Sequence, residues 1–172
     1  MARVSLILGG ARSGKSARAL ALAGGPPHVF IATAEALDGE MQARIRRHQA
    51  ERGESWWLVE APLDLVGAIR ANAADGTTLL VDCLTLWLSN VLLAEADVAE
   101  RIAALISTLK TLPGLIVVVS NEVGMGLVPE NALGRSFRDA QGRLNQCVAE
   151  ICDTVIFVAA GLPLALKGNL PS

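Results

Sequence analysis

The sequence predicts an α/β fold built on a mostly parallel central sheet, and two observations support this expectation. Short apolar segments, rich in β-branched residues and bounded by glycine, proline or asparagine, alternate with longer segments of helical periodicity. Such alternation favours parallel strands joined by right-handed helical crossovers. The hydrophobic fraction of 52% also indicates strands that are apolar on both faces, as in a sheet covered by helices on both sides.

Each expected element follows from its own segment of the 172 residues, which we take as a single domain, 1–172. The expected strands are Arg3–Leu8, His28–Thr33, Trp56–Glu60, Thr78–Asp82, Leu115–Ser120 and Thr154–Ala159, with Leu162–Leu166 as a short edge strand. Helices are expected over 15–23, from Asp38 to about Arg52, and from Pro62 to Ala73. Two further helices are indicated by the apolar stripes Ile102, Leu105, Ile106, Leu109 and Phe137, Leu144, Val148, Ile151. A third apolar group, around Trp87, Leu88, Val91 and Leu92, is expected in the core or an interface.

Charge, apolar run length and cysteine usage exclude several classes of protein. The formal net charge of −2 argues against a generally basic, nucleic-acid-binding surface. No apolar run reaches the length of a signal peptide core or a membrane span, so we expect a soluble cytoplasmic protein. The 3 cysteines lack C-x-x-C spacing, which predicts buried, reduced thiols rather than disulfides or a zinc site.

The clearest motif is a phosphate-binding loop between the first strand and the first helix. Residues 9–16 read Gly-Gly-Ala-Arg-Ser-Gly-Lys-Ser and match G-x-x-x-x-G-K-[ST] completely. The glycines let backbone N–H groups curl around phosphate oxygens, and the helix N-terminus favours an anion. The residues expected to bind nucleotide here are Gly9, Gly10, Ala11, Arg12, Ser13, Gly14, Lys15 and Ser16, with Lys15 also expected to act in catalysis.

A carboxylate at the end of a later strand completes the expected magnesium site. The segment Thr78-Thr-Leu-Leu-Val-Asp82 is an apolar strand that ends in an acid. In proteins with a phosphate loop, such an acid and the loop hydroxyl hold Mg²⁺, so Asp82 and Ser16 are the expected metal residues. The motif is weak alone, because a polar residue often ends a strand.

Two other acids stand at comparable positions. Glu35 follows the second strand, and Glu60 ends the third. A carboxylate at Glu60 can accept from the N1–H and amino group of guanine, which adenine does not offer. Helix capping or simple solvation explains the same residue equally well.

His48 lies on an expected helix that is rich in arginine. At 100° per residue, one face carries Met41, Arg44, Ile45, His48 and Arg52. Two arginines favour the neutral, nucleophilic imidazole and can hold a polyphosphate, and a neutral imidazole can attack phosphorus. An ordinary surface histidine is the simpler interpretation of the spacing alone. The other histidine, His28, precedes a strand and is expected to be structural or exposed.

The segment after the fifth strand is expected to be an ordered functional loop. It reads Ser-Asn-Glu-Val-Gly-Met-Gly-Leu-Val-Pro-Glu-Asn over residues 120–131. The next helix carries Arg135, Arg138, Asp139 and Arg143, which form either a ligand-binding face or a solvated one. Gly142 within it suggests close approach of a ligand, a helix or a subunit.

These motifs, in this order, resemble a known family over nearly the whole chain. The segments that carry the resemblance are 9–16, 31–33, 41–48, 82–85, 120–131 and 137–146. They are similar to the bifunctional adenosylcobinamide kinase / adenosylcobinamide-phosphate guanylyltransferase of cobalamin biosynthesis. The phosphate loop is generic, whereas the histidine helix and the Asn-Glu-Val-Gly-Met-Gly loop are far more specific. The resemblance implies a RecA-like P-loop NTPase fold, a three-layer sandwich, and a homotrimer.

The resemblance also implies two reactions and a set of residues. ATP or GTP would phosphorylate adenosylcobinamide, and GMP from GTP would then pass through a histidine to adenosylcobinamide phosphate, giving adenosylcobinamide-GDP. The family histidine falls on His48, whose neighbour Arg47 replaces a second histidine seen in some relatives. Further nucleotide contacts would fall on Thr33, Ala34, Glu35, Gln49, Ala50, Glu51, Arg52, Glu60 and Asp82.

Two rival functions fit part of the sequence. A small-molecule kinase without nucleotidyl transfer explains the phosphate loop and leaves the histidine helix unexplained. A nucleotide switch or regulatory ATPase predicts partner binding and slow hydrolysis, but the chain lacks the Asn-Lys-x-Asp motif of switch GTPases.

Overall fold

One seven-stranded sheet organises the computed structural model, which describes residues 3–35 and 55–170. The strand order is β3-β2-β4-β5-β1-β6-β7, and every pairing is parallel except that of β6 with β7. The strands are β1 (Arg3–Gly9), β2 (His28–Ala32), β3 (Trp56–Glu60), β4 (Thr78–Asp82), β5 (Leu115–Asn121), β6 (Thr154–Ala159) and β7 (Leu162–Lys167). The helices are α1 (Lys15–Ala21), α3 (Leu65–Asn72), α4 (Leu84–Leu93), α5 (Val98–Thr111) and α6 (Ala132–Ile151).

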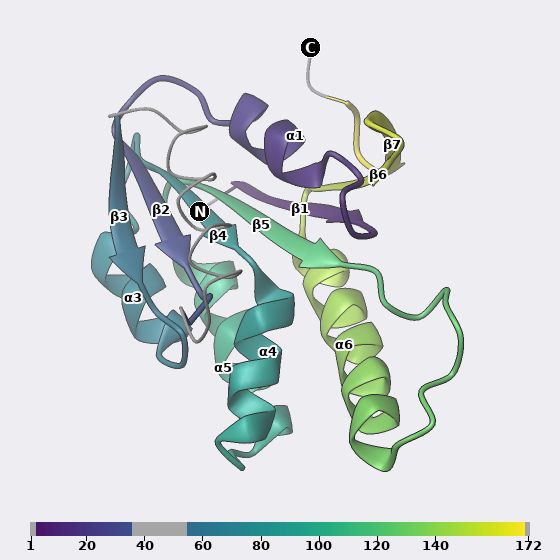
Figure 1. Ribbon diagram of the computed structural model, residues 1–172. Helices are drawn as coiled ribbons and strands as arrows, with labels where there is room; N and C mark the ends of the chain where they lie inside the picture. The colour runs from purple at the N-terminus through teal and green to yellow at the C-terminus, as the bar shows by residue number, and fades with distance from the viewer. Residues whose placement is uncertain (1–2, 36–54, 171–172) are drawn as a thin grey trace.

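The central strands are apolar on both faces, as their composition predicts. Leu6 and Leu8 of β1 join one buried cluster, and Ile7 between them joins another. Ile116 and Val117 of β5 divide in the same way. Helices α3, α4, α5 and α6 cover the first face, and α1 covers the second (Figure 1). The described residues therefore form the expected three layers, with the core on both sides of the sheet.

All seven expected strands are confirmed, with ends that differ by one residue at most. The edge strand β7 returns antiparallel to β6 through Ala160 and Gly161. Both turn residues have positive φ, 52° and 78°, which suits a two-residue hairpin between twisted strands. The antiparallel return places the end of β7 beside the start of β6, at the amino edge of the sheet.

The helix expected from Pro62 begins later than predicted. It begins at Leu65, because the side chain of Asp64 caps it by accepting a hydrogen bond from Gly67 N at 3.0 Å. The helix expected over 15–23 ends at Ala21. The helix expected from Asp38 to about Arg52 lies outside the described residues.

The apolar group near residue 87 is in the core, as expected. It forms α4, with Trp87, Leu88 and Val91 almost fully buried. The prediction of buried thiols holds for Cys83 and Cys152, whereas Cys147 is only half-buried because it lies on the side of α6 that faces a cavity. Within residues 3–35 and 55–170, no helix combines the length and the apolar character that crossing a bilayer requires.

Candidate functional site

The phosphate loop connects β1 to α1 at the carboxyl edge of the sheet. Gly14, with φ of 96°, precedes α1 in a left-handed conformation that side chains rarely adopt. A Cβ there would meet Gly161 Cα at 3.1 Å, and one at Gly9 would meet Val158 O at 2.6 Å. The close approach of β6 therefore requires a glycine at position 9, and that of the β6–β7 connection favours one at position 14. Gly161 N donates to Ser13 O at 2.8 Å and fixes the loop against that connection.

Inside the loop, two side chains are positioned toward its concave backbone. Lys15 is 7% exposed and donates from Nζ to Gly10 O at 3.1 Å, which folds the ammonium back over the loop. The hydroxyl oxygen of Ser13 is buried and has no hydrogen-bond partner in the described structure. Ala11 and Arg12 are exposed at the tip, where Arg12 has φ of 54°.

Ser16 and Asp82 come together from elements far apart in the sequence. The Ser16 hydroxyl donates to Asp82 Oδ2 at 3.4 Å. The sequence predicted this pairing, since β4 ends near the start of α1 at the same edge. A hydroxyl and a carboxylate oxygen are hard ligands of the type that Mg²⁺ prefers, so the donor set fits that ion.

Behind Asp82, the backbone of Cys83 is tied to the end of β2. Thr33 Oγ1 donates to Cys83 O at 2.7 Å and accepts from Cys83 N at 2.8 Å. The peptide bond between Asp82 and Cys83 is cis. Burial, reinforced by the neighbouring Asp82 carboxylate, raises the pKa of the Cys83 thiol to about 11. Thr33, predicted to bind nucleotide, is fully buried, and its hydroxyl is engaged with this backbone.

The two acids that follow the second strand and end the third lie farther along the same edge. Glu60 is exposed at the end of β3, and Glu35 is half-exposed after β2. Because β2, β4 and β5 separate β3 from β1, strand spacing puts Glu60 roughly 19 Å from the phosphate-loop strand. Both acids therefore share the edge with the phosphate loop without joining it. Ala34, which stands between Thr33 and Glu35 in the sequence, is half-buried.

The structure does not describe the residues on which the histidine chemistry depends. His48, Gln49, Ala50, Glu51 and Arg52 all lie outside the described ranges. The other histidine, His28, is at the opposite edge, where it contacts Gly24 O at 2.6 Å and stacks on Trp56 at a centroid distance of 4.6 Å.

The loop between β5 and α6, residues 122–131, begins directly beside the phosphate loop (Figure 1). Glu122 N donates to Gly9 O at 3.1 Å, and Asn121 pairs with Gly9 in the parallel register. Gly124 N donates to the Glu122 carboxylate at 2.6 Å. From α6, Arg138 donates to Gly124 O at 3.3 Å. The arginine face of α6 is thus partly used to hold this loop.

A buried polar network fixes the start of the same loop to α6. Gln141 Nε2 donates to Ser120 Oγ at 2.9 Å, and Ser120 donates to Asn145 Oδ1 at 2.7 Å. Asn145 Nδ2 donates in turn to Asn121 O at 3.1 Å. Ser120 and Gln141 are fully buried. The network holds the end of β5 at a fixed distance from α6.

Sequence reasoning did not assign roles to these polar residues or to Asn90. Asn90 donates from one amide nitrogen to Thr33 O at 2.9 Å and to Pro62 O at 3.0 Å, joining the segments that follow β2 and β3. Gln141 and Asn145 are four residues apart on the apolar face that carries Leu144 and Val148. Amides on an otherwise apolar helix face were the signal that such a network exists.

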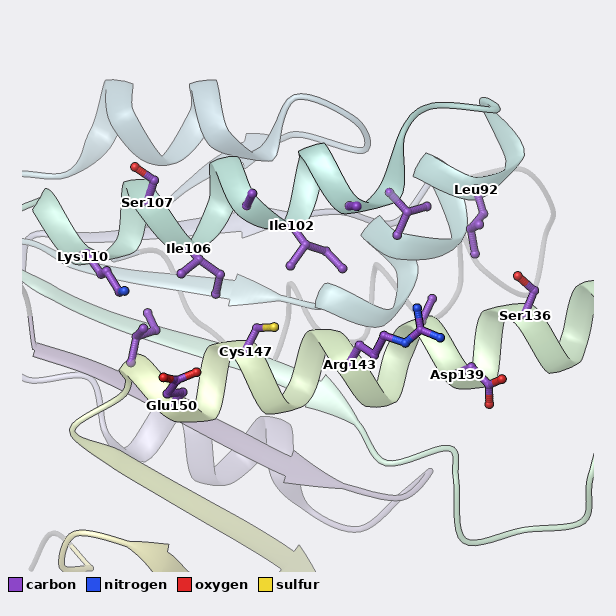
Figure 2. Close-up of a pocket in the computed structure, with 15 residues that line it drawn as sticks. Leu92, Ile102, Ile106, Ser107, Lys110, Ser136, Asp139, Arg143, Cys147 and Glu150 are labelled. Carbon is purple, nitrogen blue, oxygen red and sulfur yellow. The ribbon is translucent and has the colours of Figure 1, made fainter.

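A cavity of about 830 Å³ lies between α5 and α6, away from the phosphate loop. Figure 2 shows Ile102 and Ile106 of α5 facing Arg143 and Cys147 of α6 across it. No residue of segments 9–16 or 122–131 lines it. Gly142, predicted to permit close approach, has open space: an added Cβ would meet no atom within 4 Å.

Solved structures with the same fold have distant sequences. The flagellar accessory protein FlaH from Methanocaldococcus jannaschii matches with a TM-score of 0.52 and 15% identity over 97% of this chain and 79% of that one. A Pyrococcus horikoshii OT3 protein matches with a TM-score of 0.54 and 8% identity over 98% and 87%. These similarities show the α/β fold with a mostly parallel central sheet that the sequence predicts.

Curated relatives are much closer in sequence. The chain is 50% identical over 169 residues to the bifunctional adenosylcobalamin biosynthesis protein CobP of Pseudomonas aeruginosa, covering 95% of this chain and 97% of that protein. It is 40% identical over 178 residues to CobU of Salmonella typhimurium, covering 94% and 98%. A family model described as cobinamide kinase / cobinamide phosphate guanyltransferase matches residues 5–166. The chain therefore belongs to the cobinamide kinase / cobinamide phosphate guanyltransferase family.

Proposed function

We propose that the chain, acting as a single domain over residues 1–172, catalyses two successive transfers in cobalamin biosynthesis. The first phosphorylates the hydroxyl of adenosylcobinamide with ATP or GTP. The second transfers GMP from GTP to adenosylcobinamide phosphate and gives adenosylcobinamide-GDP. Family membership supports both reactions. The observation that carries the proposal is the phosphate loop, with Lys15 folded over it and Ser16 meeting Asp82.

In the kinase reaction, the protein's task is to position the nucleotide and neutralise charge. Phosphoryl transfer proceeds with little covalent help, so catalysis depends on alignment and electrostatic stabilisation. The backbone of segment 9–16 would hold the phosphates, and Lys15 would stabilise the charge that develops on the transferred group. The Ser13 hydroxyl, which has no hydrogen-bond partner among residues 3–35 and 55–170, supports this assignment, because a buried hydroxyl gains a hydrogen bond when a phosphate oxygen arrives.

Mg²⁺ would be held by Ser16 and Asp82. Their oxygens already lie within hydrogen-bonding distance, and a hydroxyl with a carboxylate suits a small, hard cation. When bound, the ion supplies charge neutralisation at the phosphates. Ser16 and Asp82 would supply two of its ligands.

The guanylyl transfer requires a nucleophile at the α-phosphorus, which the phosphate loop does not contain. We assign this role to His48. A neutral ring nitrogen attacks the α-phosphorus of GTP, a P–N bond forms, and the bond to the leaving pyrophosphate breaks. An oxygen of adenosylcobinamide phosphate then attacks the same phosphorus, and the P–N bond breaks to regenerate the histidine. Nucleotide contacts are assigned to Ala34, Glu35, Glu60 and residues 49–52, in addition to the phosphate loop. Thr33, which is fully buried and bonded to the Cys83 backbone, is instead assigned the role of holding the backbone behind Asp82.

A pair of labelling reactions tests this function. The purified protein is incubated with Mg²⁺ and with GTP labelled at either the α- or the γ-phosphate, then denatured and mapped by peptide mass. The expected result is an acid-labile, alkali-stable GMP adduct on His48 from the α-label only. Phosphorylation of adenosylcobinamide by γ-labelled nucleotide tests the kinase reaction separately.

The two histidines of the chain provide a matched control. His48→Gln should abolish the adduct, whereas His28→Gln should retain it, because His28 lies at the amino edge of the sheet. A wild-type protein that binds GTP but forms no adduct would contradict the guanylyltransferase. Kinase activity without the adduct would identify a simple P-loop kinase.

Assembly and location complete the proposal. The family resemblance implies a homotrimer, and we place the protein in the cytoplasm, where ATP and GTP are available. Sedimentation of the purified protein tests the trimer, and a sedimenting monomer would contradict it. Fractionation of cells that express the chain tests the location.

A further inference from the structure

The β5–α6 loop combines a fixed base with exposed apolar side chains. Its start is bonded to the phosphate loop and to the buried network on α6. Farther along, Met125 is 79% exposed, Leu127 97% and Val128 61%. The described part of the chain leaves most of the surface of these three residues exposed. Apolar side chains gathered at one exposed site indicate a surface that another molecule covers.

The place of the β5–α6 loop beside the phosphate loop limits which molecule can cover these apolar side chains. Glu122 N donates a backbone hydrogen bond of 3.1 Å to the carbonyl oxygen of Gly9, the first glycine of the phosphate loop. Ser16 at the start of α1 and Asp82 at the end of β4 mark the phosphate end of the same site, and β5 lies between β1 and β4 in the sheet. A hydroxyl that accepts a phosphoryl group must reach this end of the nucleotide. The bulk of the accepting molecule then extends over the loop that follows β5.

We propose that Met125, Leu127 and Val128 form a binding surface for the corrin ring of the acceptor substrate. This inference rests on the proposed function, which supplies the acceptor's chemistry: a large amphipathic macrocycle with an apolar face and an amide rim. Apolar side chains cover the face, and the exposed backbone groups of a glycine-containing loop are available to the rim. The loop is held at Gly124 by Arg138, and at its far end Arg135 donates to Glu130 O at 2.5 Å. The surface is therefore supported at both ends while its side chains stay accessible.

Leu127→Ser tests the surface with little risk to folding, since the Leu127 side chain is almost fully exposed. Burial of a leucine side chain against a ligand is large enough to raise KM for adenosylcobinamide about tenfold or more when it is lost. KM for ATP should stay within about twofold, because the phosphate loop is unchanged. Corrinoid binding, followed by difference absorbance without nucleotide, should weaken by the same factor as KM rises.

Leu166→Ser is the matched control. Leu166 is a leucine that is 57% exposed, but it lies on β7 beside the start of β6, at the amino edge of the sheet. Its substitution should leave both Michaelis constants unchanged. An unchanged KM and an unchanged corrinoid affinity in Leu127→Ser would overturn the proposal. So would a change in sedimentation with corrinoid affinity preserved, because the surface would then be covered by a second copy of the chain.

The GMP adduct separates this inference from the proposed function. Its formation needs GTP and no corrinoid, so Leu127→Ser should form it as the wild type does. A loss of adduct in Leu127→Ser as large as its loss of corrinoid affinity would overturn the proposal, because the loop would then act on the nucleotide. If the wild type forms no adduct and phosphorylates no corrinoid, the proposed function fails. The corrin surface would also be overturned if, in addition, the wild type bound no adenosylcobinamide in the absorbance titration.

Discussion

Two neighbouring loops at the carboxyl edge of the sheet are built in opposite ways. The phosphate loop after β1 is shaped by its backbone, with glycines at close contacts and a buried lysine. The loop after β5 is held by side chains of α6, and it exposes Met125 and Leu127. A backbone hydrogen bond from Glu122 to Gly9 joins the two.

The difference shows how one sheet edge can serve two substrates. A phosphate group is recognised by many backbone N–H groups and one cation, which requires a compact loop with little side-chain freedom. A large apolar surface is recognised by exposed side chains on a supported segment. Parallel neighbouring strands place these two kinds of loop side by side, so the reacting groups can meet between them.

The largest effect is expected from a substitution in the phosphate loop alone. Lys15→Ala should lower kcat of the kinase about 10²- to 10³-fold, since it removes one preorganised positive group from the developing charge. Lys167→Ala is the matched control, because Lys167 lies on β7 and donates to the carbonyls of Ala149 and Glu150 at the end of α6. Steady-state kinetics measure both variants. Corrinoid affinity should be unchanged in Lys15→Ala, and a parallel loss of that affinity would contradict separate loops.

A second substitution weakens the support of the β5–α6 loop. Asn145→Ala removes the acceptor for Ser120 and the donor for Asn121 O, so the free energy of unfolding should fall by about 1–3 kcal/mol. Gln146→Ala, which truncates an exposed neighbouring amide, should change it far less. Urea denaturation measures both, and equal losses would show that the buried network does not stabilise the loop's base.

A smaller effect tests how tightly the phosphate loop is constrained. Gly14→Ala should lower the free energy of unfolding by about 1–2 kcal/mol, because an alanine is strained at φ of 96°. Gly10→Ala is the control, since no atom lies within 4 Å of an added Cβ and its φ is not positive. Thermal unfolding compares the two. Similar midpoints would indicate that the loop adapts to a side chain at Gly14.

The smallest expected effect is at the α5–α6 cavity, which belongs to neither loop. A maleimide at pH 8 should label Cys147 first, because it is the half-buried thiol and lines that cavity. Cys83 and Cys152 should stay unlabelled, since burial raises their pKa values to about 11 and about 12 and keeps them protonated. Raising the pH to 9 should not make these two thiols reactive, because their pKa values remain above 9.

Labelled protein should retain its kinase activity within about twofold, as expected for a surface change away from the site. Peptide mapping gives the labelled residue, and kinetics give the activity. A large loss of activity would place the cavity in the catalytic cycle and undermine the assignment of function to the two loops.

Most of the fold could be predicted because the sheet is apolar on both faces. The continuous apolar runs of β1, β4 and β5 mark strands directly, and the alternation with helices implies their parallel order. The start of α3 could not be placed, since Asp64 and Pro62 are both suitable first-turn residues and only the cap to Gly67 decides between them. Strand order itself depends on packing between distant segments.

The candidate site, like the fold, could be predicted only in part. The phosphate loop and the meeting of Ser16 with Asp82 were predictable, because each follows from residue type and position at a strand end. The roles of Asn90 and Gln141 were not, since an amide on a helix does not reveal which distant carbonyl or hydroxyl it reaches. The use of Thr33 to hold Cys83 likewise appears only when β2 and β4 are side by side.

Hydrogen exchange with each substrate separately tests the division between the two loops most directly. GTP alone should slow exchange of the backbone amides of residues 10–16, and adenosylcobinamide alone should slow exchange of residues 123–128. Protection of both segments by their own ligand would support one edge with two recognition loops. Protection by adenosylcobinamide that is confined to α5 and α6, with residues 123–128 unchanged, would contradict it.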